Sequence, residues 1–221
     1  MKNLIGALAL ILAFGAGALA GPAAQLPPRD DAGDDASFKE FLGAFRGSVH
    51  YRNKDEVLAA VAPDIKFSFG EDGGREAFAR NFALDDAASK FWDDMTDLLE
   101  LGAVRDEAGQ GFWLPYVYGA WPEEFDAFEY MAVVRKDAVL REAPRPDAKA
   151  VRTLNYDIVQ QDFAVEERTG ESSEPVWVAV ILADGIKGFL LRRDVRSPID
   201  YRAHFVKRGG AWQMDVLVAG D

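Results

Sequence analysis

The sequence of 221 residues contains no cysteine. This absence excludes disulfide bonds, thiolate metal ligands and a cysteine nucleophile. Histidine is nearly as scarce, with His50 and His204 as the two copies. A zinc hydrolase usually needs three protein ligands, commonly including two or three histidines, and the HExxH pattern is absent. We therefore predict no metal site and no cofactor, and expect both histidines to be packed polar or solvent-exposed side chains.

Catalytic and nucleotide-binding motifs are also missing. The chain has no G-x-S-x-G elbow, no Walker loop and no dinucleotide glycine fingerprint. It has 37 acidic against 25 basic residues, so carboxylate pairs such as Asp93-Asp94 and Glu123-Glu124 arise from abundance alone. Adjacent acids are usually solvated. The net charge of −12 argues against nucleic acid and anionic membrane surfaces, because both attract basic side chains.

Only the N-terminus is strongly apolar. Lys2 precedes an apolar stretch over residues 4–14, and Ala18-Leu19-Ala20 offers an A-x-A cleavage site. We expect residues 1–20 to be a secretory signal peptide and the protein to be periplasmic or secreted. No later segment approaches the ~20 apolar residues that a membrane-spanning helix needs, so we predict no span after cleavage.

The charge distribution divides the rest of the chain. Residues 21–36 are rich in Pro, Ala and Asp, which predicts a disordered linker; their acids lack the ligand alternation of a calcium loop. Residues 37–130 hold 9 basic and 19 acidic residues, whereas residues 131–197 hold 11 of each. This change predicts an acidic α+β domain followed by a separate module.

Helix signals dominate the acidic domain. Ser37-x-x-Glu40 is a capping box, and the apolar residues from Phe38 to Phe45 fall on one helical face. Asn53 marks a second helix start. Further predicted elements are a half-buried strand at Ile65–Phe69, a helix carrying Phe78 and Phe82, a helix over residues 86–101 ended by Gly102, and an aromatic, strand-like stretch at 111–121 interrupted by Pro115.

From Met131 onward the pattern is that of β-strands. Asp184-Gly185 between two apolar runs predicts a hairpin, and Gly188 indicates a bend or a close backbone approach. Residues 198–221 form another hairpin around Gly209-Gly210. This terminal hairpin either covers an edge of the second module or returns to pair with Ile65–Phe69; we favour the return.

Residues 131–197 resemble a bacterial Src-homology-3 (SH3) domain. The resemblance rests on Val139, Arg141 and Pro144 at the start, on Trp177 and Val180 in one strand, and on the return strand Gly185, Gly188, Phe189 and Leu190. It implies a small barrel and a secreted bacterial protein of a family whose function is unknown. The expected fold class is thus α+β: a helical N-terminal domain with a small sheet, plus an SH3-like β-barrel.

Aromatic residues are the best candidates for a binding site. The predicted ligand-binding residues are Trp113, Tyr116, Tyr118, Trp121, Tyr156 and Phe189. Core packing is the alternative for all six, and Phe189 lacks the polar tip of a Trp or Tyr. Aromatic grooves of SH3 folds bind peptides. We expect a non-enzymatic binding or scaffold protein that engages a cell-wall peptide or an envelope protein. The alternatives are a cell-envelope hydrolase with a carboxylate site in the acidic domain and a small-molecule-binding N-terminal pocket.

Overall fold

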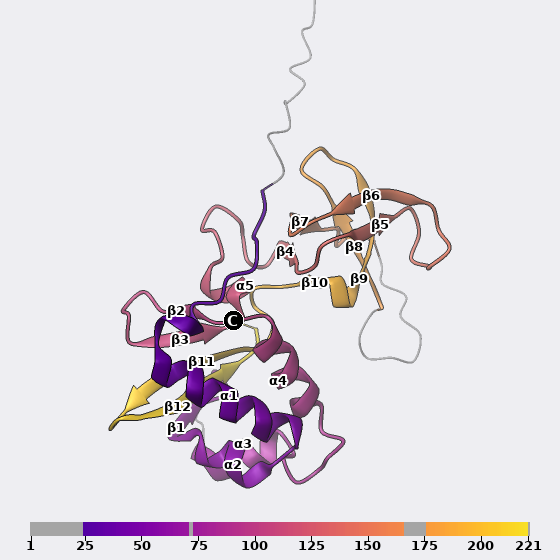
Figure 1. Ribbon diagram of the computed structural model, residues 1–221. Helices are drawn as coiled ribbons and strands as arrows, with labels where there is room; N and C mark the ends of the chain where they lie inside the picture. Colours follow the sequence, from indigo (N-terminus) through magenta and orange to yellow (C-terminus); the bar gives the residue numbers. More distant parts are fainter. Residues whose placement is uncertain (1–23, 71–72, 166–175, 221) are drawn as a thin grey trace, which may run out of the picture.

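The computed structural model describes residues 24–70, 73–165 and 176–220, so the predicted signal peptide lies outside the described residues. The architecture is mixed α+β, as expected, with two sheets that belong to two structural units (Figure 1). The first unit holds the helices and a five-stranded sheet, and the second is built on a seven-stranded sheet.

The first sheet combines strands from both ends of the chain. Its order is β1 (Val61–Lys66), β12 (Ala211–Val218), β11 (Arg202–Arg208), β3 (Gly111–Leu114), β2 (Val104–Arg105). β1 runs parallel to β12, and the other pairs are antiparallel. The C-terminal hairpin therefore returns to the N-terminal unit, and the second unit is inserted between β3 and β11.

Three of the five described helices begin at a residue whose side chain caps the helix. The five are α1 (Ala36–His50), α2 (Lys54–Ala59), α3 (Gly74–Asn81), α4 (Lys90–Glu100) and α5 (Tyr116–Gly119), with 3₁₀ turns η1 (Ala32–Asp34) and η2 (Arg192–Asp194). The capped helices are α1, α2 and α4. The predicted Asn53 cap of α2 is confirmed. The cap of α1 is Asp35 and not Ser37: the Asp35 carboxylate accepts the N–H groups of Ser37 and Phe38 at 2.9 and 3.0 Å.

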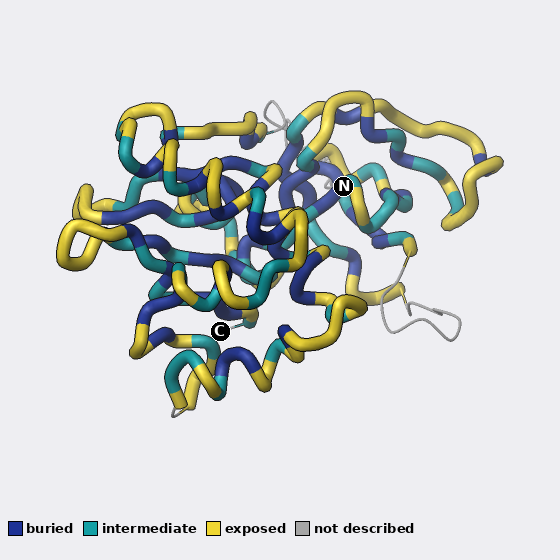
Figure 2. The backbone as a smooth tube through the Cα atoms, turned by 60° about the horizontal axis from the view of Figure 1, so that its bottom comes forward, coloured by how far each residue is buried: buried dark blue, intermediate teal, exposed yellow. Residues whose placement is uncertain are grey.

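Aromatic packing joins α1 to the first sheet. Phe38 stacks on Phe112 with ring centroids 4.0 Å apart, and the Trp212 centroid lies 4.8 Å from that of Phe38 and 5.7 Å from that of Phe112. Phe205 contacts Phe41 and Phe45 edge-on. Burying one such side chain contributes about 1.5–3 kcal/mol, so this cluster is a main source of stability. The interior appears as dark blue segments in Figure 2.

Two predicted strands have other bounds than expected, and the first covers Val61–Lys66 and not Ile65–Phe69. β1 ends at Lys66, and Phe69 is 65% exposed beyond it. The aromatic stretch at 111–121 is a strand only as far as Leu114, because Pro115 has no N–H to continue the ladder and α5 starts directly after it.

The second sheet is antiparallel with two free ends. Its order is β10 (Val195–Arg196), β4 (Tyr130–Val133), β7 (Ile158–Gln161), β8 (Trp177–Ile181), β9 (Lys187–Leu191), β5 (Ala138–Arg141), β6 (Ala150–Leu154). Among the described residues β10 and β6 do not pair, so the strand order is not that of the closed barrel we expected. The hairpin at Asp184-Gly185 is confirmed, with Gly185 at φ +82°.

The segment expected to be a disordered linker is ordered from residue 24 onward. Leu26 donates its N–H to the Tyr156 carbonyl at 2.7 Å, and Ile158 donates to Ala24 at 2.8 Å. The Asp31 carboxylate accepts the N–H of Arg105. Leu26 is buried in an apolar cluster with residues of both units. The acids are therefore used as hydrogen-bond acceptors, and the segment fastens the two units together.

We predict that Gly188→Ala destabilises the protein by about 1–3 kcal/mol in denaturant unfolding, as overpacking does. A Cβ at this position would lie 2.7 Å from the carbonyl oxygen of Arg141 and 2.8 Å from Cγ of Leu140. Gly47→Ala in α1 is the matched control, because its Cβ meets nothing within 4 Å. The control should be neutral or slightly stabilising. Equal stability of the two variants would contradict the close approach.

Candidate functional site

The six predicted ligand-binding aromatics fall in separate places. Trp113 and Tyr118 contact each other on the face of the first sheet opposite the helices, with ring centroids 4.7 Å apart. The guanidinium of Arg202 lies 4.9 Å from the Tyr118 ring centroid, and His204 lies 4.6 Å from Trp113. Both predicted residues are half-buried. Trp113, Tyr118, Arg202 and His204 form a small aromatic and cationic patch in which each side chain already contacts another member.

The other four predicted residues lie elsewhere. Tyr116 is fully buried in the apolar cluster between the units, where burial raises its pKa to about 12. Trp121 packs beside it and donates its indole N–H to the Phe125 carbonyl at 2.9 Å. Tyr156 occupies a turn at φ +61°, and Phe189 is half-buried on β9. The structure thus brings Trp113 together with Tyr118 and Tyr116 with Trp121, but does not gather the six in one groove.

His204 lies between two carboxylates. Its Nδ1 is 2.7 Å from Asp215 and its Nε2 is 3.1 Å from Asp106. The register of β11 on β12 shifts here: His204 pairs with Val216 and Phe205 with Met214, which leaves Asp215 as the extra residue beside the ring. Burial alone would lower the pKa of His204, but hydrogen bonds and charge attraction from both aspartates outweigh it and raise the pKa.

This arrangement suits a structural ion cluster. With both ring nitrogens bonded to carboxylates, the protonated ring has no lone pair for a metal or for proton abstraction. Asp215 also binds Arg208 at 3.1 Å, which ties the cluster to the end of the hairpin. The expectation of ordinary polar packing therefore describes His204 well. His50, by contrast, is exposed at the end of α1 against Tyr51.

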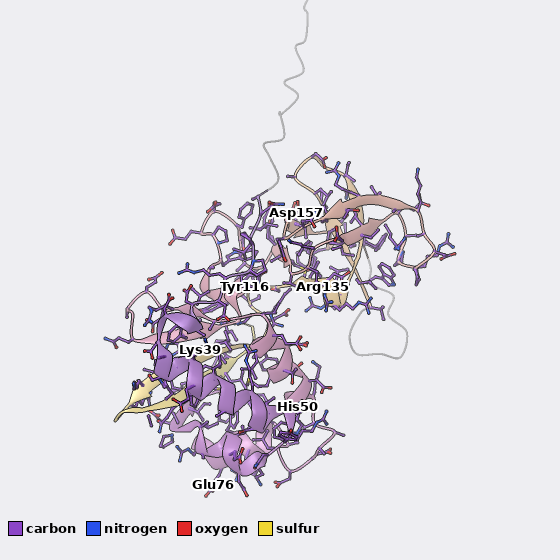
Figure 3. The ribbon with its side chains drawn as sticks, viewed as in Figure 1. Lys39, His50, Glu76, Tyr116, Arg135 and Asp157 are labelled. Carbon is purple, nitrogen blue, oxygen red and sulfur yellow. The ribbon has the colours of Figure 1, made fainter. Side chains whose placement is uncertain are left out.

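The largest hollow described is a cleft of about 1360 Å³ between the two units. Its lining comes from the α3–α4 region, from the end of β4, from the flanks of β8 and β9, and from the segment around β10. Tyr116 and Arg135 both lie at this junction of the units in Figure 3. None of the six predicted aromatics lines the cleft, whereas Trp177, Phe82 and Tyr201 do.

The wall from the second unit is basic. Five arginines line it: Arg135, Arg141, Arg192, Arg193 and Arg196. Two carboxylates pair with this group among the described residues. Asp194 lies 3.5 Å from Arg135 and 3.8 Å from Arg193, and Asp200 pairs with Arg192 at 2.9 Å. Over the part of the chain that the structure describes, the wall therefore carries an excess of positive charge.

Arg196 is the most constrained of these arginines. It donates one terminal N–H to the Tyr201 carbonyl at 2.5 Å. Its Nε is buried and has no hydrogen-bond partner among the described residues. Burial lowers its pKa, although Asp200 and Asp97 attract the charge. A buried donor without an acceptor costs about 1–3 kcal/mol, so this nitrogen is a local cost to the stability of the fold.

The opposite wall is acidic and belongs to α4. Asp94, Asp97 and Glu100 recur at intervals of three residues, which places them along one side of the helix. Asp94 pairs with Lys90. Asp97 keeps contact with solvent, yet loss of part of its hydration raises its pKa. No hydrogen bond or ion pair to the Asp97 carboxylate occurs within the described part of the chain.

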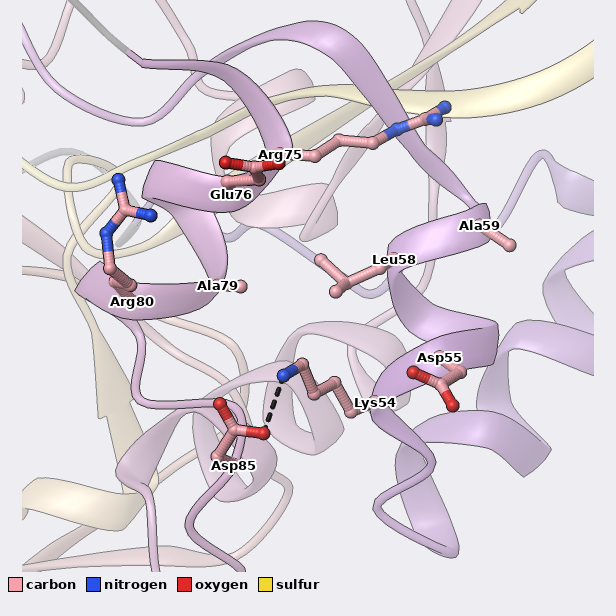
Figure 4. Close-up of a pocket in the computed structure, with 9 residues that line it drawn as sticks. All are labelled: Lys54, Asp55, Leu58, Ala59, Arg75, Glu76, Ala79, Arg80 and Asp85. Atoms are coloured by element: carbon pink, nitrogen blue, oxygen red, sulfur yellow. Dashed lines mark hydrogen bonds and ion pairs between the residues drawn. The ribbon is translucent and has the colours of Figure 1, made fainter.

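A second, smaller hollow of about 460 Å³ lies between α2 and α3 (Figure 4). Two of its three basic groups have partners: Lys54 binds Asp85 at 2.5 Å, and the Arg75 side chain donates to the Val61 carbonyl. The surrounding acids balance these cations. This hollow offers no charge excess and no buried donor that lacks a partner, and the cleft is the stronger candidate.

Comparisons of the chain with protein-family models, with curated proteins and with solved structures give no match. Over the described residues, no helix has the length and apolar character needed to cross a membrane. The site therefore has to be judged on its own geometry.

Sequence reasoning overlooked the cleft because its two walls are distant in the chain. The acidic triplet on α4 and the run Arg192-Arg193 are separated by about ninety residues, and neither is a recognised motif. One signal was present: acidic residues are concentrated before residue 130, whereas the arginines of the cleft all follow it. Such an asymmetry predicts electrostatic complementarity but not where the two surfaces meet.

We predict that the stability contributed by His204 falls as the pH rises. The raised pKa means that the ion cluster is fully formed below the unfolded pKa near 6.5 and is lost as the pH passes the higher folded-state value. His204→Gln should lose about 1–3 kcal/mol at pH 6 and less at higher pH. Denaturant unfolding over this pH range measures the difference, with His50→Gln as control. A pH-independent loss would contradict the charged cluster.

Proposed function

We propose that this chain is an exported, non-enzymatic binding protein that engages a peptide-bearing protein or cell-envelope partner through the cleft between its two units. The observation that carries the proposal is the cleft itself. Its volume of about 1360 Å³ exceeds the ~300–1,000 Å³ of typical small-molecule pockets, which favours a peptide or oligomer over a single metabolite.

The proposal includes an SH3-like second unit. Support comes from the motif order in the sequence and from the β8–β9 hairpin, in which Gly188 packs tightly against β5. Trp177 opens this hairpin, is only half-buried and lines the cleft. Because SH3 folds bind peptides on aromatic surfaces, Trp177 takes over the binding role that the sequence suggested for Trp113.

A hydrolase in the acidic unit is the second candidate, and one observation favours it. The raised pKa of Asp97 suits a general acid. However, a hydrolase that works with two carboxylates does not need arginines on the opposite wall. A binding cleft for a charged partner uses both walls. The binding function therefore accounts for more of the site.

We predict that Trp177→Ala abolishes retention on purified peptidoglycan in a pull-down, while Trp113→Ala is retained like the wild type. Trp177 lines the cleft, whereas Trp113 packs on His204 at a different surface. Circular dichroism confirms folding of both variants. Loss only in Trp113→Ala would move the site to the aromatic patch, and equal or absent retention of all three proteins would contradict an envelope-binding cleft.

The export part of the proposal has its own test. N-terminal sequencing of protein recovered outside the cytoplasm should begin at Gly21, because Ala18-Leu19-Ala20 is the cleavage site. Recovery of the chain with Met1 intact would contradict cleavage. This experiment does not depend on the identity of the ligand.

A further inference from the structure

We infer that the cleft binds a dipolar ligand, a short peptide with a free carboxylate and a free ammonium group, with its carboxylate on the arginine wall and its ammonium on α4. This rests on the proposed function, and specifies the ligand class that the same site would take. Three features of the cleft carry it: a side that suits an anion, a side that suits a cation, and apolar side chains in the lining.

The anion side is formed by arginines that outnumber their carboxylate partners among the described residues. Arg193 and Arg135 have side chains 74% and 60% exposed, and they share the single described carboxylate of Asp194. Arg196 lines the same wall, where one terminal nitrogen of its guanidinium donates to the Tyr201 carbonyl. Guanidinium groups bind carboxylates through paired hydrogen bonds, and several such groups on one wall favour an anionic end of the ligand.

The cation side is formed by Asp97 and Glu100, one turn apart on α4. Neither carboxylate has a hydrogen bond or an ion pair with any described residue. An ammonium group carries three donors and no acceptor, so it can contact both carboxylates at once. Since the cleft removes part of the hydration of Asp97, a charged donor is the best replacement for the lost water.

Part of the lining of the cleft is apolar. Trp177 and Leu191 from the second unit and Phe82 from the first unit contribute to it. These side chains would pack against the apolar body of the ligand. A peptide with one apolar residue between free termini offers a group to each of the three kinds of surface.

A simpler explanation would be that the two walls merely attract each other and hold the units together. Within the described residues, however, no ion pair of 4 Å or less joins the α4 acids to the arginines across the cleft. The units are already fastened by residues 24–36 and by the apolar cluster around Leu26 and Tyr116. The facing charges therefore remain available to a ligand.

The test is isothermal titration of the full mature chain with the tripeptide Ala-Phe-Ala in four forms: free, N-acetylated, C-amidated and doubly blocked. The free form should bind at least tenfold more tightly than either singly blocked form. Asp97→Asn should weaken the free and C-amidated forms and leave the N-acetylated form unchanged. Arg193→Gln should weaken the free and N-acetylated forms and leave the C-amidated form unchanged.

The exposed ion pair of Arg52 with Asp93 supplies matched controls. Asp93 lies on α4 outside the cleft and is 78% exposed, so Asp93→Asn and Arg52→Gln should bind all four forms like the wild type. Equal affinity for blocked and free peptides would overturn the dipolar ligand but not the proposed binding function. Absence of binding to every form would also overturn the dipolar ligand. The proposed function would still be decided separately by the peptidoglycan pull-down.

Discussion

The pairing of β12 with both β1 and β11 is the constraint on which the rest of the structure depends. It places the last strand of the chain in the interior of the first sheet, so the first unit cannot be completed until the C-terminus has been placed. The second unit is consequently an insertion attached by two chain connections. Together with residues 24–36, these connections bring α4 and the arginine segment to opposite sides of one cleft.

This arrangement explains how opposite charges face each other without collapsing into ion pairs. The apolar cluster around Tyr116 packs residues of both units together, whereas no ion pair among the described residues joins the α4 acids to the arginines. Unpaired charges at a partly desolvated surface cost free energy, which a ligand recovers when it supplies the missing partners. The ion cluster around His204 differs from the cleft in this respect. Asp106 and Asp215 supply partners for both ring nitrogens, so the cluster stabilises the sheet without exposing a binding group.

Local features were predictable from the sequence. The Asn53 cap, the Gly102 stop and the Asp184-Gly185 hairpin each depend on a few neighbouring residues, and all three occur where expected. Asp35 displaced Ser37 as a cap because both are good acceptors and only the backbone geometry chooses between them. The linker was mispredicted for a related reason: composition indicates solvation, but it does not reveal that Asp31 accepts a hydrogen bond from Arg105.

The site was less predictable because it arises from tertiary placement. The register shift that places Asp215 beside His204 has no sequence signature. Trp177 belongs to an apolar strand, yet it starts the strand and borders the cleft. That Asp97 and Arg196 line the same cleft depends on how the two units pack, which no local pattern encodes.

The central claim, that the cleft is a preorganised binding site with a basic wall, can be tested at a single side chain. The Arg193 Nε–H signal can be followed by ¹⁵N NMR while Ala-Phe-Ala is added, with Arg52 as internal reference, because Arg193 lines the cleft and its side chain is 74% exposed. We expect the Arg193 signal to shift in a saturable way as the peptide carboxylate binds its guanidinium, while the Arg52 signal stays unchanged. An Arg193 signal that does not move at saturating peptide would contradict the claim.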